Sequence, residues 1–107
     1  MTGFMIGILA SSAAMQAAPA WTFDQAVDCS VTTAIMMATS SGSDQLSYQN
    51  ANTFWSSAIF EAGTSAGMSA ETVGPLVEQT YQARGAQYST DPASVQAIAD
   101  ACVAQAG

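Results

Sequence analysis

The chain has no histidine and no lysine, and its only basic side chain is Arg84. Histidine and lysine are the commonest general bases and the usual partners of a serine or cysteine nucleophile, so triad and Cys–His mechanisms have no base here. Carboxylate pairs remain, such as Asp24 with Asp28 and Glu71 with Glu78, but such pairs are typical of solvated helix surfaces. We therefore expect no catalytic residue and a protein that is not an enzyme.

Positive charge is almost absent, and the formal net charge is -7 at pH 7. Nucleic acids and anionic membrane surfaces are bound mainly through lysine and arginine, so neither is an expected partner. Complementary charge steers association, which favours a basic protein partner. The acidity also serves solubility, and this second interpretation stays open.

Cysteine is scarce, and the two cysteines, Cys29 and Cys102, are far apart in the sequence. Zinc sites need several Cys or His ligands, and haem attachment needs a CxxCH motif. Met36, Met37 and Met68 are conceivable soft ligands for copper, but methionines usually fill gaps in a core. We expect no metal and no cofactor.

The N-terminal segment has the pattern of a signal peptide. An apolar stretch at Phe4–Ala10 is followed by Ala18-Pro19-Ala20, an A-x-A cleavage pattern directly before Trp21. The stretch is too short for the roughly 20 apolar residues of a membrane-spanning helix. The sequence therefore predicts a signal peptide at 1–20 and a helical domain at 21–107 without a membrane span.

An exported chain of this size is expected to be periplasmic or secreted and to contain a disulfide. The even pair of cysteines predicts a Cys29–Cys102 bond in an oxidising compartment. Small domains bury a smaller fraction of their surface than large ones do and gain stability from such bonds. Positive charge is missing from Met1–Met5, which leaves open whether Met1 is the true start.

Apolar residues at helical spacing, separated by turn signals, predict an all-α domain with the architecture of a small four-helix bundle. The expected helices run from about Phe23 to Ala38, from Ser43 or Asp44 to a C′ glycine at Gly63, from Ser69 or Thr72 to about Tyr88, and from Asp91-Pro92 to about Ala106. Gly74-Pro75 is expected to kink or delay the third helix. The disulfide would then join the first and last helices.

Several side chains are candidates for binding. Arg84, flanked by Tyr81 and Tyr88 on the apolar side of its helix, either forms a structural ion pair or grips a carboxylate or phosphate of a ligand. Met36 and Trp55 could line a pocket between helices together with Leu76.

The remaining large aromatic side chains are Trp21, Phe54 and Phe60. We expect them to complete the core from the side, and a surface that anchors a partner is the alternative.

The preferred hypothesis is a non-catalytic, exported protein-binding module of the inhibitor, immunity or accessory type. The alternatives are a carrier of a small apolar ligand and an envelope stress or structural protein. Two cysteines in a short exported helical chain resemble the layout of periplasmic acid-stress chaperones, but those are rich in lysine, so no family is assigned. The partner and the oligomeric state stay open.

Overall fold

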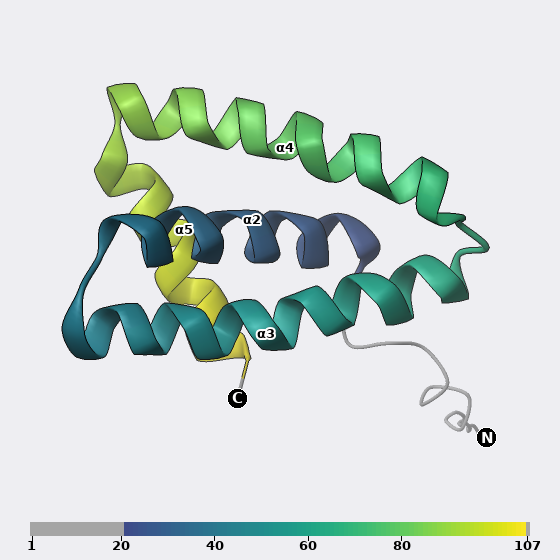
Figure 1. Cartoon of the computed structure of the whole chain (residues 1–107), viewed down its shortest axis with the longest axis horizontal. Helices are drawn as coiled ribbons and strands as arrows, with labels where there is room; N and C mark the ends of the chain where they lie inside the picture. Colours follow the sequence, from purple (N-terminus) through teal and green to yellow (C-terminus); the bar gives the residue numbers. More distant parts are fainter. Residues whose placement is uncertain (1–20, 107) are drawn as a thin grey trace, which may run out of the picture.

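The computed structural model describes residues 21–106, and the expected signal peptide lies outside the described residues. The described part of the chain is all-α, as predicted, and contains four helices (Figure 1). They are α2 (Phe23–Thr39), α3 (Gly42–Ser65), α4 (Ala70–Thr90) and α5 (Pro92–Gln105). No helix in this range is long and apolar enough to cross a bilayer.

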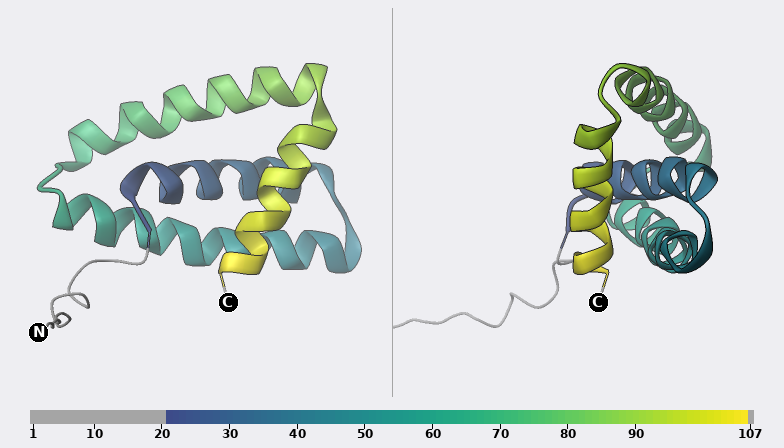
Figure 2. Two further views of the ribbon diagram at one scale, coloured as in Figure 1. Left: turned by 180° about the vertical axis from the view of Figure 1, so that it is seen from behind. Right: turned by 90° about the vertical axis from the view of Figure 1, so that its left-hand side faces the viewer.

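Helix α2 is the central element of the fold. It lies between α3 and α4 and contacts all three other helices (Figure 1). Helix α5 crosses α2 and α3 steeply, as Figure 2 shows from two further directions. The central position explains why α2 is apolar on two sides. Val27 and Met36 lie on opposite faces of this helix, and both are buried.

The disulfide is confirmed. Cys29 in α2 is bonded to Cys102 in α5, with the two Cα atoms 5.4 Å apart. The bond therefore joins the first and last helices, as the sequence predicts. Both cysteines are buried, so the bond is part of the core.

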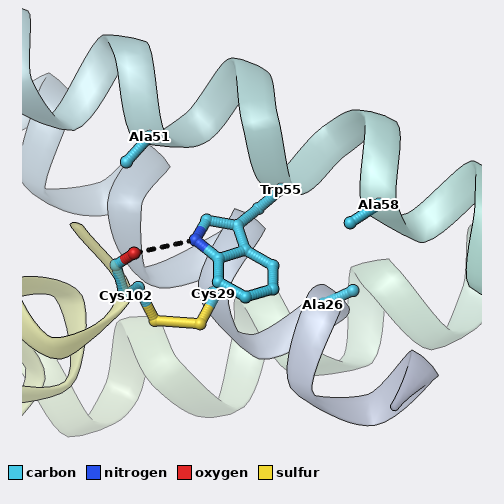
Figure 3. Packing of buried hydrophobic residues seen from close by; sticks show 6 residues of the cluster. All are labelled: Ala26, Cys29, Ala51, Trp55, Ala58 and Cys102. Carbon is cyan, nitrogen blue, oxygen red and sulfur yellow. Dashed lines mark hydrogen bonds between the residues drawn. A yellow bond between two sulfur atoms is a disulfide. The ribbon is translucent and has the colours of Figure 1, made fainter. Parts of the chain in front are cut away.

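Trp55 fills the space beside the disulfide (Figure 3). Its side chain is fully buried, and its indole N–H donates a hydrogen bond of 2.9 Å to the carbonyl oxygen of Cys102. Trp21 and Phe54 pack edge-on against each other and against Trp55, which confirms their expected place at the side of the core. The residues around the indole are small, which lets the helices approach closely; the buried cluster consists of Ala26, Cys29, Ala51, Trp55, Ala58 and Cys102.

A second buried cluster lies farther along α2 and consists of Met36, Tyr48, Val95 and Ala99. The Tyr48 hydroxyl donates a hydrogen bond of 2.6 Å to the Asp100 carboxylate. Burial first, and then the hydrogen bond and negative charge of Asp100, raise the pKa of Tyr48 to about 12.

This pKa predicts a loss of stability in alkali. Tyrosine in an unfolded chain has a pKa of about 10, so the folded state holds the Tyr48 proton more tightly. The resulting contribution to stability is present below about pH 10 and is lost as the pH rises towards about 12. We expect the free energy of denaturant unfolding to fall over this window and to fall less in Tyr48→Phe. An equally steep fall in the variant would contradict the assignment.

Two helix boundaries differ from the sequence prediction. Helix α3 does not end at Gly63, which lies inside the helix and is buried; a Cβ there would lie 3.5 Å from the Phe23 ring and 3.6 Å from Val73. The chain turns instead at Gly67, whose φ of +76° is the left-handed conformation that glycine tolerates. The start of α3 is also earlier than predicted, at Gly42 after the N-cap Ser41.

Pro75 does not delay α4, which begins at Ala70 after the N-cap Ser69. Pro75 lies inside the helix, where its missing N–H leaves the carbonyl of Glu71 without the usual helical hydrogen bond. The first turn of the helix therefore forms ahead of the proline. Asp91 caps α5 as predicted, accepting a hydrogen bond from the backbone N–H of Ser94, and Pro92 is the first residue of that helix.

Candidate functional site

Helix α4 is the least embedded part of the fold. It has 21 residues, and none of them is buried. It packs on α2 and on α5, and its apolar side chains Val73, Leu76 and Val77 are only half-buried. Two hollows that are lined in part by this helix are the candidate binding sites.

The first hollow is the α2–α4 groove, with a volume of about 430 Å³. Its apolar lining comes from Phe23 and Val27 of α2 and from Leu76 and Ala83 of α4. Its polar lining comes from both helices as well and consists of Asp24, Asp28, Gln79, Thr80, Arg84 and Gln87. The groove therefore combines an apolar part with charged groups.

Arg84 of α4 binds Asp28 of α2, and both side chains line this groove. Its Nε donates to Asp28 Oδ1 at 2.7 Å and its Nη2 to Asp28 Oδ2 at 2.8 Å, a bidentate pair. Its Nη1 donates to Gln87 Oε1 at 2.6 Å, and Gln87 donates to the Ser94 hydroxyl at 2.8 Å. The hydrogen bond with Asp28 raises the pKa of Arg84. This network ties α4 to α2 and α5.

The ion pair predicts a measurable coupling between the two helices. Both side chains are partly exposed, so solvent screens the pair, and we expect a coupling energy of about 0.5–1 kcal/mol. The measurement is a double-mutant cycle of urea unfolding with Arg84→Gln and Asp28→Asn. A coupling energy near zero would show that α4 is held by its apolar contacts alone.

The second hollow lies at the turn between α3 and α4 and has a volume of about 240 Å³. Its apolar lining includes Ile59, Phe60, Met68 and Val73, which we call the Phe60 patch. Phe60 is 78% exposed, which is more than the exposed side chains of Leu46 and Tyr81 elsewhere in the described residues. The expectation that Phe60 completes the core is wrong, because most of its surface is exposed and it belongs to neither buried cluster.

The binding residues predicted from the sequence do not form one site. Trp55 and Met36 are buried in the two separate core clusters, and Tyr88 packs against the second cluster. Leu76 instead lines the α2–α4 groove together with Arg84. Tyr81 is 40% exposed on α4. Met36, Trp55 and Leu76 therefore do not surround a common pocket.

The sequence placed Asp28 only in a carboxylate pair with Asp24, and it offered a surface that anchors a partner as the alternative role of Phe60. The partner of Arg84 lies 56 residues away in the sequence, and spacing alone gives no sign of such a contact. In the sequence, Phe60 directly follows Ile59 and lies at the edge of the apolar side of α3. This position is the only sequence feature that indicates an exposed side chain.

No protein-family model, curated protein or solved structure matches the chain. Within residues 21–106 no group of three or more His, Cys, Asp or Glu side chains is placed to hold a metal ion.

Proposed function

We propose that this protein is an exported, non-catalytic module that binds a basic protein through the Phe60 patch. The observation that carries the proposal is the 78% exposure of Phe60 beside an apolar hollow. Burying a phenylalanine side chain contributes about 1.5–3 kcal/mol of favourable free energy, and Phe60 does not make this contribution in the free protein. Aromatic anchors next to a hollow are typical of the energetic centres of protein interfaces.

Charge supports a basic partner. The chain carries a formal charge of -7, and Glu61 lies directly beside Phe60 in the sequence and lines a shallow hollow with it. Glu71 follows Ala70, which lines the main hollow of the patch. A partner that inserts an apolar side chain and surrounds it with lysine or arginine would complement both features.

The disulfide supports export to the periplasm or secretion. Disulfides persist in oxidising compartments and are rare in the cytosol, where thiols are kept reduced. A bond that lies in the core and joins the first and last helices has a structural role, which is the common use of disulfides in small exported domains.

The test compares Phe60→Ala with Leu46→Ala, because both residues are exposed on α3 and only Phe60 belongs to the patch. The oxidised protein and both variants are used in parallel to capture proteins from the cell envelope and culture medium of the source organism. We expect a basic protein to be retained by the wild type and by Leu46→Ala, and Phe60→Ala to bind it about 30-fold more weakly. Both variants should unfold within about 0.5 kcal/mol of the wild type.

Equal retention by Phe60→Ala would contradict the assignment of the Phe60 patch. Retention of an acidic protein alone, or of none, would contradict the proposed partner. Raising the salt concentration from low to high should weaken the complex, because exposed charges across an interface are screened.

A second candidate function, carriage of a small molecule, is favoured by one separate observation. The α2–α4 groove lies within the usual ligand-pocket range of about 300–1,000 Å³ and has a mixed apolar and polar lining.

A further inference from the structure

We infer that the α2–α4 groove binds a small organic cation, an ammonium group on a short apolar chain or ring. The inference names the ligand class for the carrier function and does not depend on the Phe60 patch. Its basis is the set of charges in the groove, together with the apolar side chains beside them.

The charges of the groove leave one carboxylate without a basic partner. Arg84 is the only cationic side chain of the protein, and it is bound to Asp28 through two of its nitrogens and to Gln87 through the third. Asp24 lines the same groove, and no arginine, lysine or histidine remains to pair with it. A cation bound in the groove therefore meets the negative charge of Asp24, which lines the groove and is exposed to solvent.

An anionic ligand has no comparable place. Three of the five N–H groups of the Arg84 guanidinium already donate to Asp28 and Gln87, and its positive charge is paired with the Asp28 carboxylate. With Asp24 and Asp28 against Arg84, the lining also carries a net charge of -1. An anion is therefore repelled, whereas a cation is attracted.

The apolar portion of the ligand has its own contacts. Phe23 precedes Asp24 in the first turns of α2, and the face of a phenylalanine ring attracts cations. Val27, Leu76 and Ala83 continue the apolar lining along the groove. A phenyl or short alkyl group attached to the ammonium would cover these side chains, of which Leu76 is only half-buried in the free protein.

The test is an NMR titration of the oxidised protein with three probes of similar shape and different charge. They are 2-phenylethylammonium, neutral 2-phenylethanol and anionic 3-phenylpropionate. We expect saturable shifts of the Phe23, Val27, Leu76 and Ala83 signals with the ammonium probe. The alcohol should bind about threefold to fivefold more weakly, because an exposed ion pair contributes up to about 1 kcal/mol. The carboxylate should bind more weakly still.

Asp24→Asn and Glu71→Gln form a matched pair of variants. Each removes one negative charge from the first turn of a helix, but only Asp24 lines the groove. Asp24→Asn should weaken ammonium binding by about threefold to fivefold and leave alcohol binding unchanged, whereas Glu71→Gln should change neither. Equal effects of the two variants, equal binding of the three probes, or the absence of saturable shifts would each overturn the inference.

Phe60→Ala separates this inference from the proposed protein-binding function. That variant should lose the protein partner and retain the ammonium probe with unchanged affinity. Loss of both in Phe60→Ala would overturn the assignment of two independent sites.

Discussion

Replacing Cys29 and Cys102 together by alanine is expected to lower the free energy of unfolding by about 4 kcal/mol. The bond spans 73 positions of the sequence, and in the chain-entropy model a closed loop of that length restricts the unfolded chain by about this amount. For a domain whose total stability is of the order of 5–15 kcal/mol, this is a large share. The thermal midpoint should fall by about 20 °C.

The measurement is urea or thermal unfolding of the double variant beside the oxidised wild type, followed by circular dichroism. Alanine is the appropriate replacement, because a serine hydroxyl would need a hydrogen-bond partner in this buried position. Reduced wild-type protein should unfold near the midpoint of the double variant. An unchanged midpoint would mean that helix packing alone determines the stability.

Truncating Trp55 to alanine is expected to cost about 3–5 kcal/mol, because it leaves a cavity where the largest fully buried side chain lies. The indole contacts residues of three helices in the disulfide cluster, and Trp21 and Phe54 pack against it. Loss of the indole therefore removes the common contact of α2, α3 and α5.

The variant Trp55→Phe separates the contribution of packing to the stability from the contribution of the indole hydrogen bond. Phenylalanine keeps part of the volume but cannot donate to the Cys102 carbonyl, which retains its hydrogen bond of 3.0 Å from the Ala106 N–H. We expect a smaller loss, about 1–2 kcal/mol, in urea unfolding. Phe60→Ala is the exposed aromatic control. A cost as large for Phe60 as for Trp55 would contradict the assignment of Phe60 to the surface.

Local sequence signals predicted the helices well, because each depends on short-range physics. The cap and proline at Asp91-Pro92 place the start of α5 from two adjacent residues. The turn after α3 was predicted four residues too early, because Gly63 and Gly67 are equally suitable as C′ glycines in the sequence. Only the packing of Phe23 and Val73 against Gly63 distinguishes them.

The candidate sites were less predictable, because they depend on contacts between distant residues. The sequence identified Arg84 as exceptional and offered an ion pair as one of two roles, but its partner Asp28 became evident only from the packing of α4 on α2. Leu76 was expected near Met36 and Trp55 and lies instead in the α2–α4 groove. Apolar spacing gives the side of a helix that faces inward, but it does not give how deeply that side is buried.

The sequence by itself determined the all-α class, the approximate extent of the four helices and the disulfide between the first and last of them. Helical periodicity, capping residues and the pair Cys29 and Cys102 are local or compositional features, so no tertiary information is needed to recognise them. Only the tertiary structure decided that α4 has no buried residue, that Arg84 binds Asp28 and that Phe60 is exposed. These properties depend on how the helices pack against one another: α5 crosses α2 and α3 steeply, Trp55 is enclosed between these helices, and α4 lies at the edge of the fold (Figure 2).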